Sequence, residues 1–296
     1  MKNCPVCGNT EFESVYELDD YKITHETFSL EKCPNCTLIF TVDPPLGENI
    51  GHYYKSDDYL EHSNRKTDLF SKMYSWARDF MFSYKYGIIK KLAKEGSILD
   101  IGAGSGHFLN FMSSKGFTAT GIEMNERART YAKNNFGIDV HPDHYLYSPK
   151  LSQKFDMISL WHVMEHLFDL DKVVSRLSEL LSHDGHLVIA LPNYRALEVS
   201  IYKKYWNGWD VPRHLWHFSS ESVGHLFEKH HFEITQMKMM PLDPFFNTLL
   251  TNKYRNGNPI LNVFKMVAVG GMSFLYGLIN VKKASSIIYI IKKKKV

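Results

Sequence analysis

The chain has 296 residues, of which 44% are hydrophobic and 23% charged, and 35 Lys and Arg against 32 Asp and Glu give a formal net charge of +3. This composition excludes a wholly disordered, collagenous or disulfide-scaffold protein, and the length allows one large domain or two modest ones. So small a net charge also argues against general polyanion binding, and any basic function must be local.

All four cysteines lie in two C-x-x-C pairs, Cys4/Cys7 and Cys33/Cys36. Two such pairs are typical of one tetrathiolate site that holds zinc. Redox chemistry, the alternative for C-x-x-C, needs a helix start that lowers a thiol pKa, whereas short β-prone segments surround both pairs here. We therefore predict a zinc ribbon over residues 1–42. Zinc-bound thiolates and the lack of a basic-then-apolar signal segment predict a cytoplasmic protein.

Residues 43–95 form the second predicted region, an aromatic linker followed by helices. Prolines and a glycine between Asp43 and Gly47 interrupt any strand. Between Leu69 and Lys94 the apolar residues recur every three or four positions, which predicts one long helix or two shorter ones.

From Gly96 onward, short apolar runs alternate with helical segments. The predicted strands are residues 97–101, 118–122, 156–160 and 186–191, and the predicted helices are 107–114, 126–135 and 170–181. This alternation indicates an α/β fold, with a doubly wound, mostly parallel Rossmann-like sheet over residues 96–240. A helix at 220–229 and a strand at 232–239 complete this region. Residues 241–296 are predicted to form a C-terminal cap and a final strand at 286–291.

The most informative segment runs from Ile98 to Leu109, where a strand leads through alternate glycines into a helix. Such a loop lets the backbone approach a ligand at the free amides of the helix start. Asp100 stands just before the glycines, where it would repel a pyrophosphate but could hold an ammonium group. Glu123 ends the next strand, where acids bind ribose hydroxyls.

A ligand with a ribose, an adenine and a cationic amino-acid part, but no phosphates, is S-adenosylmethionine. From about Ile98 to Leu191 the chain resembles the class I S-adenosylmethionine-dependent methyltransferases, whose first motif is an acid followed by G-x-G-x-G. The resemblance implies that the methionine end is held by Asp100, Gly102 and Gly104, the ribose by Glu123 and the adenine by Met124, with Asp143 near the adenine amino group.

Methyl transfer to a hydroxyl or carbon acceptor requires removal of a proton. His162 and His166 follow the predicted strand at residues 156–160 and share one face if the segment is helical. A metal site on these two histidines lacks a third ligand. This segment resembles the one that closes over the cofactor in related enzymes, including quinone-biosynthesis O-methyltransferases. The resemblance implies cofactor binding for His162 and makes His166 a candidate general base.

A second cluster, residues 206–219, contains three tryptophans, an arginine and two histidines. Large aromatic side chains must be buried against something, either the acceptor or a packed segment whose Ser219 caps the next helix, and both can hold. The run from Pro212 to Ser219 resembles a segment of bacterial methyltransferases, some from sugar and polysaccharide gene neighbourhoods. It implies that His214 and His217 are candidate catalytic residues.

A two-knuckle ribbon followed by a tyrosine-rich linker resembles the sugar C-methyltransferases that act on nucleotide-linked deoxysugars. Their linker tyrosines fold over the cofactor, which implies that role for Tyr54 or Tyr59. This chain departs from those enzymes in its shorter C-terminal half. We therefore expect methyl transfer to a small metabolite, most simply a sugar, a glycan or a lipid precursor.

Two other functions compete with this expectation. An RNA methyltransferase could use the ribbon to hold its substrate, but residues 1–42 contain three basic and seven acidic residues. Phosphate binding needs the opposite balance, so no nucleic acid partner is expected. A non-catalytic cofactor-binding scaffold is the other alternative. The oligomeric state and the acceptor atom stay open.

The uncharged run from Met266 to Val281 is too short and too rich in glycine for a membrane-spanning helix. It is interpreted either as a helix that covers the substrate side or as an apolar lid for a lipid-like acceptor. The lid would rest on an anionic membrane through Lys292 to Lys295, a peripheral membrane contact.

Overall fold

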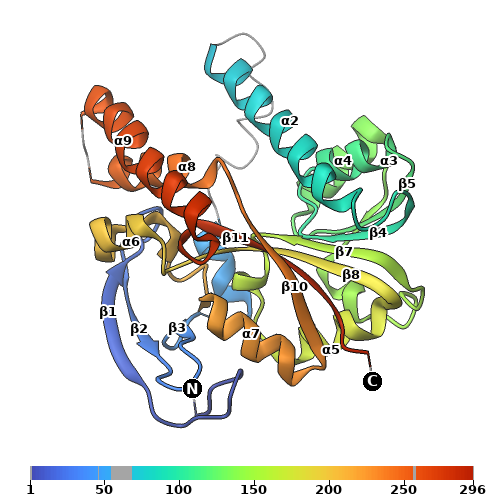
Figure 1. Cartoon of the computed structure of the whole chain (residues 1–296), viewed down its shortest axis with the longest axis horizontal. Helices are drawn as coiled ribbons and strands as arrows, with labels where there is room; N and C mark the ends of the chain where they lie inside the picture. The colour runs from blue at the N-terminus through green and yellow to red at the C-terminus, as the bar shows by residue number, and fades with distance from the viewer. Residues whose placement is uncertain (1, 46, 55–68, 256–257, 296) are drawn as a thin grey trace. The chain divides into compact units, whose positions relative to one another are not determined.

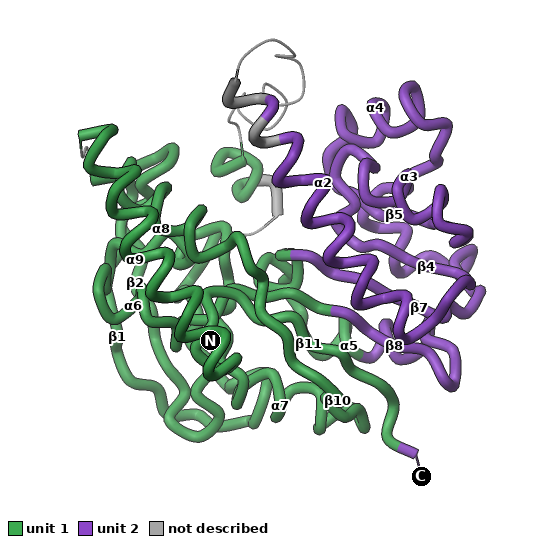
Figure 2. Tube along the Cα trace, turned by 45° about the horizontal axis from the view of Figure 1, so that its top comes forward, with its two compact units in different colours: residues 1–55, 162–174, 189–294 green, residues 56–161, 175–188, 295–296 purple. Residues whose placement is uncertain are grey.

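The computed structural model of the chain describes residues 2–45, 47–54, 69–255 and 258–295. The chain forms two compact units, each built from separate stretches of sequence (Figure 2). Unit 1 contains residues 1–55, 162–174 and 189–294, and unit 2 contains residues 56–161, 175–188 and 295–296. Helix α5 (Leu170–Leu180) and strand β8 (Leu181–Pro192) each belong partly to both units.

Unit 2 is built on parallel strands in the order β7-β4-β5-β6 (Figure 1). Its strands are β4 (Gly96–Ile101), β5 (Phe117–Ile122), β6 (Val140–His141) and β7 (Phe155–Trp161). Its helices are α2 (Leu69–Ile89), α3 (His107–Ser113) and α4 (Glu126–Phe136). The central strands are apolar runs because both of their faces are covered, and Leu99 and Ile158 are fully buried.

These elements confirm the predicted alternation and the predicted α/β fold with a mostly parallel sheet. Strand β8 differs from its prediction, because it begins at Leu181 rather than at His186. The strand therefore includes Ser182, His183 and Asp184, which precede the predicted start.

Unit 1 contains an antiparallel sheet in the order β1-β2-β3-β9. Its strands are β1 (Glu13–Asp19), β2 (Thr27–Lys32), β3 (Ile39–Thr41) and β9 (Trp216–His217). A second set of strands has the order β10-β11-β8, where β10 (Phe232–Met239) and β11 (Ser286–Lys293) pair antiparallel. The predicted final strand is thus confirmed, and its residues from Ile287 to Ile291 are buried.

The helices of unit 1 are α6 (Leu197–Tyr202), α7 (Ser220–Lys229), α8 (Asp243–Tyr254) and α9 (Pro259–Ile279). The predicted cap of α7 is confirmed, because the Ser219 side chain accepts a hydrogen bond from the backbone amide of Ser222 in a reciprocal capping box. Helix α7 packs on β10, while α8 and α9 pack side by side (Figure 1).

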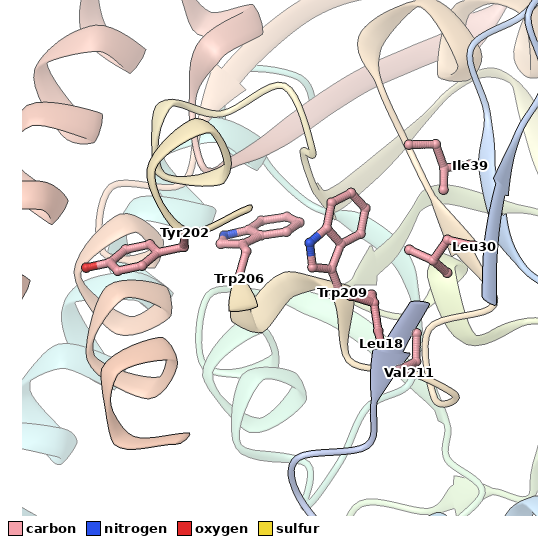
Figure 3. Close-up of a cluster of buried hydrophobic side chains, with 7 residues drawn as sticks. All are labelled: Leu18, Leu30, Ile39, Tyr202, Trp206, Trp209 and Val211. Carbon is pink, nitrogen blue, oxygen red and sulfur yellow. The ribbon is translucent and has the colours of Figure 1, made fainter. Parts of the chain in front are cut away.

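The N-terminal strands and residues 206–219, hereafter the aromatic strap, share one hydrophobic core (Figure 3). Its fully buried members are Leu18, Leu30, Ile39, Tyr202, Trp206, Trp209 and Val211. The rings of Trp206 and Trp209 meet edge to face, with centroids 5.4 Å apart. The apolar face of the N-terminal strands is therefore covered by the strap and not by the strands alone.

Candidate functional site

The loop after β4 has the backbone that its glycines predict. Gly102, Gly104 and Gly106 adopt φ values of 76°, 54° and 76°, which side-chain-bearing residues rarely adopt. A Cβ on Gly106 would lie 2.7 Å from Ala132 Cβ, so this glycine also allows the start of α3 to approach α4 closely. In this shape the Gly102 amide donates a hydrogen bond to the Ile122 carbonyl oxygen and the Gly104 amide donates one to Glu123, so both glycines lie against the end of β5.

Glu123 ties this loop to the end of the neighbouring strand. Its Oε2 accepts a hydrogen bond of 2.9 Å from the Gly104 amide, and its Oε1 accepts one of 2.9 Å from the Asn125 amide. The parallel register places Asp100 beside Gly121, so the carboxyl ends of β4 and β5 carry the two acids at the same edge. Both acids are buried, and sequence spacing alone predicted their positions.

The surroundings of the Asp100 carboxyl group favour pairing with a cation. Burial raises the pKa of Asp100 to about 7, although the Ser159 hydroxyl and the charge of Lys85 act to lower it. Ser159 donates a 2.6 Å hydrogen bond to Asp100 Oδ1. Lys85 lies over the ring of Trp161, 4.1 Å from its centroid. A carboxyl group with this pKa lacks a strong positive partner in the described structure, and a ligand ammonium would supply one.

Two other predicted cofactor contacts in unit 2 lie at its surface. The side chain of Met124 is 58% exposed, which leaves it accessible to an adenine face. Asp143 begins the short helical turn Asp143–Tyr147, and its carboxylate lies 3.9 Å from the His144 ring nitrogen. Both assignments stay predictions.

The histidines and Tyr54 belong to unit 1. His162 directly follows Trp161, the last residue of β7, and adopts an uncommon φ of 57°. Its Nε2 lies 3.0 Å from Asp243 Oδ2, and its Nδ1 lies 3.5 Å from Glu165 Oε1. Burial alone would lower the pKa of His162, but these two carboxylates raise it to about 10. His162 is therefore a fixed cation at neutral pH and cannot accept a proton.

The hydrogen-bond partners of His166 differ from those of His162. Its Nδ1 lies 2.9 Å from the carbonyl oxygen of Arg213 and 3.2 Å from the Tyr54 hydroxyl. A neutral imidazole whose Nδ1 donates to a carbonyl carries its lone pair on Nε2, the atom that a general base uses. Tyr54 thus contacts His166, its role over the cofactor stays a prediction, and Tyr59 lies outside the described residues.

His214 and His217 are both buried in the aromatic strap. Burial, together with the charge of His166, lowers the pKa of His214 to about 4, and its Nδ1 lies 2.8 Å from the Gly208 carbonyl oxygen. Burial also lowers the pKa of His217 well below its usual value, and its Nε2 lies 3.3 Å from the Thr41 hydroxyl. Both rings are neutral at physiological pH, and their catalytic roles stay predictions.

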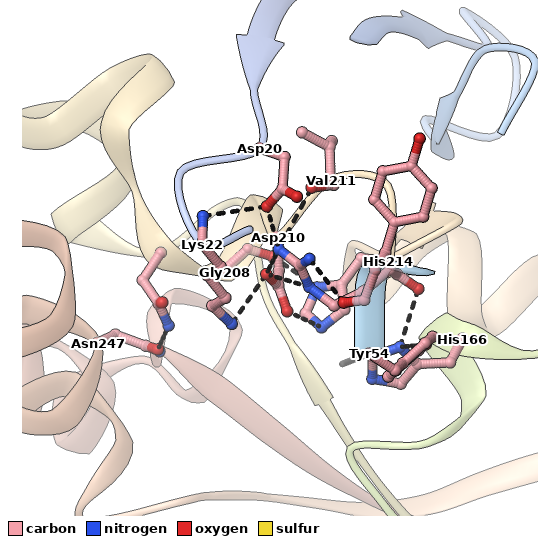
Figure 4. Close-up of polar contacts among 12 residues, drawn as sticks. Asp20, Lys22, Tyr54, His166, Gly208, Asp210, Val211, His214 and Asn247 are labelled. Carbon is pink, nitrogen blue, oxygen red and sulfur yellow. Dashed lines mark hydrogen bonds and ion pairs between the residues drawn. The ribbon is translucent and has the colours of Figure 1, made fainter. Parts of the chain in front are cut away.

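An ion network around Arg213 holds the strap in place (Figure 4). Arg213 Nη2 lies 2.7 Å from both Asp20 Oδ1 and Asp210 Oδ1, and its Nη1 donates to the Tyr53 carbonyl oxygen. Lys22 adds a 2.8 Å contact to Asp210. Burial would raise the pKa values of Asp20 and Asp210, but the surrounding cations hold them below the usual range. Because Arg213 also offers its carbonyl to His166, this network positions the candidate base.

Among the described residues, the possible metal-ligand atoms beside His166 belong to Glu165 and His214 and not to His162. The His162 side chain contacts Asp243. Three possible ligand atoms, one each from Glu165, His166 and His214, lie within 4.8 Å of one another. Burial would raise the pKa of Glu165, yet the three neighbouring histidines lower it. This spacing is compatible with a shared divalent cation.

The four cysteines converge on one point. Cys4 Sγ lies 3.5 Å from Cys36 Sγ, and Cys7 Sγ lies 3.4 Å from Cys33 Sγ. Tetrahedral zinc with bonds of about 2.3 Å would set its sulfurs about 3.8 Å apart. The two pairs form matching turns, in which Gly8 donates to the Cys4 carbonyl oxygen and Thr37 to that of Cys33. The arrangement is compatible with the predicted zinc site.

The described geometry agrees with a comparison against known protein families. A family described as "Methyltransferase domain" matches residues 73–237, more than half of the chain. The chain belongs to this family. The matched residues contain the glycine loop and both acids, together with the histidines and the strap.

Relatives of this methyltransferase domain cover only part of the chain. An uncharacterised methyltransferase of Alkaliphilus oremlandii (strain OhILAs) is 31% identical over 100 residues, which are 33% of this chain and 46% of that protein. A ubiquinone biosynthesis O-methyltransferase of Pelagibacter ubique (strain HTCC1062) is 31% identical over 110 residues, 35% of this chain and 45% of that protein. The chain spans less than half the length of either relative.

Solved structures share the fold of the methyltransferase domain at low identity. One is a cyclopropane synthase from Mycobacterium tuberculosis, with a TM-score of 0.51 and 14% identity over 82% of this chain and 96% of that one. Another is an S-adenosylmethionine-dependent methyltransferase from Archaeoglobus fulgidus, with a TM-score of 0.50 and 19% identity over 77% of this chain and 100% of that one.

Three contacts around the candidate site have no signal in the sequence. Ser159 is an ordinary residue of a buried strand, and nothing marks it as the partner of Asp100. Asp20 counts only as one acid among seven in the ribbon, although it binds Arg213 across 193 positions. Glu165 stands between His162 and His166 in the sequence, but only its burial beside His162 indicates a role.

Proposed function

We propose that the chain is an S-adenosylmethionine-dependent methyltransferase for a small metabolite, a sugar, glycan or lipid precursor. One observation carries this proposal. Buried Asp100 and Glu123 flank a positive-φ glycine loop at the carboxyl ends of two adjacent parallel strands, inside a domain of the methyltransferase family. An ammonium and a ribose diol fit this pair of acids.

The residues present fit the cofactor without further change. When bound, S-adenosylmethionine supplies a methyl group on a sulfonium that an acceptor displaces in line. Asp100 would hold the ammonium, the loop backbone at Gly102 and Gly104 would lie beside the methionine end, and Glu123 would accept hydrogen bonds from the ribose. Intact acids also argue against a non-catalytic scaffold.

Among the histidines, His166 best supports the role of general base. Its Nδ1 is directed at the Arg213 carbonyl oxygen, which leaves Nε2 to accept a proton from an acceptor hydroxyl or carbon. His162 is excluded from that role because two carboxylates keep it protonated. The name of the Pelagibacter ubique relative, an O-methyltransferase, supports a hydroxyl acceptor.

Charge supports a small acceptor rather than RNA. The ribbon carries seven acidic and three basic residues. Two of these charged residues, Asp20 and Lys22, already form ion pairs with the strap. We also propose that Cys4, Cys7, Cys33 and Cys36 bind one zinc ion. Such a site would be structural, because all four positions of a tetrahedral ion are filled by thiolates.

The affinity for the cofactor is expected to depend on pH through Asp100. The pKa of Asp100 lies near 7 in the free protein, so the group is protonated below that pH and must lose a proton to bind an ammonium. Affinity should fall about tenfold for each pH unit below 7 and level off above it. Calorimetry from pH 5.5 to 8.5 in buffers of different ionisation enthalpy measures both the affinity and the proton released. A flat profile would refute this role for Asp100.

The reaction is tested by methyl transfer from labelled cofactor into a small-molecule extract and, separately, into RNA. We expect label in the small-molecule fraction and none in RNA. His166→Gln should reduce the rate by about 100-fold or more, the usual contribution of a general base, without changing cofactor affinity. His183→Gln, a substitution of an exposed histidine, is the matched control and should keep the rate.

Two outcomes would contradict the proposal. Label in RNA alone would overturn the acceptor class while leaving the cofactor site intact. Cofactor binding without transfer to either material would favour the scaffold instead.

A further inference from the structure

Helix α9 buries the face that carries its small residues and exposes the face that carries its large apolar residues. Its buried residues are Asn262, Gly270, Ser273 and Gly277. Phe264 and Ile279, in contrast, are 69% and 86% exposed, and Val267, Leu275 and Leu278 are also more than half exposed. Within the described residues, α9 is also the helix whose length and composition would allow it to cross a membrane. A helix that covers a hydrophobic core would instead bury its large apolar side chains.

Specific contacts set this orientation. The Ser273 hydroxyl donates to the carboxylate of Glu198, a fully buried residue of α6. A Cβ on Gly270 would lie 3.0 Å from the backbone of Phe245 in α8, and one on Gly277 would lie 3.1 Å from Ala284. Rotating α9 would bring large side chains into these close contacts. A membrane-spanning α9 would have to leave these contacts and break the hydrogen bond between Ser273 and Glu198.

The segments that contain α6, α8 and α9 expose charges of one sign, although the exposed Glu221 of α7 interacts electrostatically with Arg195 and Lys282. Residues 193–209 and 240–285, which include α6, α8 and α9, contain only two acids, Glu198 and Asp243. The first is buried, and the second is paired with His162. The exposed basic residues of the same stretches are Arg195, Lys203, Lys204, Lys253, Arg255, Lys282 and Lys283.

We propose that the helical layer formed by α6, α8 and α9 docks on an anionic lipid bilayer, with α9 lying in the interface. Apolar side chains would enter the acyl boundary while the basic residues meet lipid phosphates, the arrangement of interfacial helices. Exposed Tyr276, Phe264 and Phe246 add the aromatic groups that favour this depth. This surface lies outside the proposed catalytic residues, so the inference does not depend on methyl transfer.

The C-terminal lysines are a weaker candidate for this contact. Lys292 lies 3.2 Å from Glu233, and Lys294 lies 2.9 Å from Glu228, so at least two of the four lysines are already paired with acids. Lys292 also belongs to β11, whose main chain is paired in the sheet. The expected membrane contact is therefore assigned to the helical layer.

The full chain can be tested by sedimentation with large unilamellar vesicles. It should bind vesicles of phosphatidylcholine with one-third phosphatidylglycerol and bind pure phosphatidylcholine at least tenfold more weakly. Phe264→Ser with Leu278→Ser should weaken binding by about tenfold or more. Lys282→Glu with Lys283→Glu should do the same, because each basic residue near the surface contributes to binding.

Matched controls come from exposed residues of unit 2. Trp76→Ser, which removes another exposed aromatic, and Lys94→Glu with Lys150→Glu should each bind within twofold of the wild type. Unchanged thermal melting shows that each variant is folded. The proposal is overturned if the wild type ignores anionic vesicles, if both α9-region variants bind as it does, or if light scattering shows a dimer that Phe264→Ser with Leu278→Ser dissociates.

Discussion

Replacing Asp100 with alanine should weaken S-adenosylmethionine binding by about 100-fold or more, measured by calorimetry at pH 8. A hydrogen bond to a charged group contributes about 1.5–3 kcal/mol, and an ammonium held by a buried carboxylate uses at least one such bond together with the charge itself. At pH 8 the carboxyl group, whose pKa is about 7, is already ionised in the free protein. The full contribution of its charge is therefore lost in the variant.

The same substitution should not destabilise the free protein at pH 8. Burial raises the pKa of Asp100 from 3.8 to about 7, so the folded state disfavours the ionised group. The stability that a protonated Asp100 allows is complete below about pH 3.8 and is lost as the pH rises to 7. Above that pH the buried charge opposes folding, and Asp100→Ala should melt at the same temperature as the wild type or higher.

Ser159→Ala is the matched control for this position. It removes the 2.6 Å hydrogen bond to Asp100 but leaves the carboxyl group in place, so affinity should fall by less than tenfold. An Asp100→Ala protein that binds the cofactor as tightly as the wild type would show that the glycine loop has another purpose. A variant that loses both binding and stability would show a structural role for Asp100.

The parts of the site that sequence predicts are those whose signals are local. Asp100 and its glycines lie within one short segment, from Asp100 to Gly106, and each glycine is required by a positive φ that the structure shows. The strand and helix alternation of unit 2 follows from apolar runs that need no distant partner. Ser219 is predicted as a helix cap for the same reason, because its partner Ser222 is three residues away.

The features that escape prediction depend on contacts between distant residues. Ile39 pairs with His217 across the boundary between ribbon and strap, and nothing in either short segment marks the other as its partner. Arg213 reaches Asp20 in the same way. Because Arg213 positions the carbonyl group that contacts His166, the ribbon and the candidate base belong to one network, although their motifs suggest separate roles.

Helix α9 shows a second limit. Its apolar residues predict a helix, and the rule that apolar residues face inward would bury Phe264 and Leu278. The structure reverses this because glycines and a serine fit the close approach to α6 and α8, where larger residues would collide. Only the three-dimensional contacts distinguish a core helix from one that presents its apolar side to an external surface.

Replacing Cys4 and Cys33 with serine should release one zinc ion per chain and unfold the ribbon, as measured by metal analysis and thermal melting. Structural zinc in small sites contributes roughly 10–16 kcal/mol, comparable to the whole stability of a domain. The effect should extend into the strap, because the Thr41 amide donates a 3.0 Å hydrogen bond to Leu215 and β3 pairs with β9. Hydrogen exchange of the Trp216 and His217 amides should therefore accelerate in the variant.

Thr37→Val separates metal loss from loss of packing. It removes the 2.7 Å contact between the Thr37 and Ser219 hydroxyls but leaves all four thiols, so the protein should keep its metal and lose about 1 kcal/mol of stability. Chelation of the wild type should reproduce the faster exchange of the double cysteine variant. If the wild type contains no metal, the zinc assignment fails. If metal is lost but strap exchange stays slow, the packed core of Trp206 and Trp209 holds the strap without the ion.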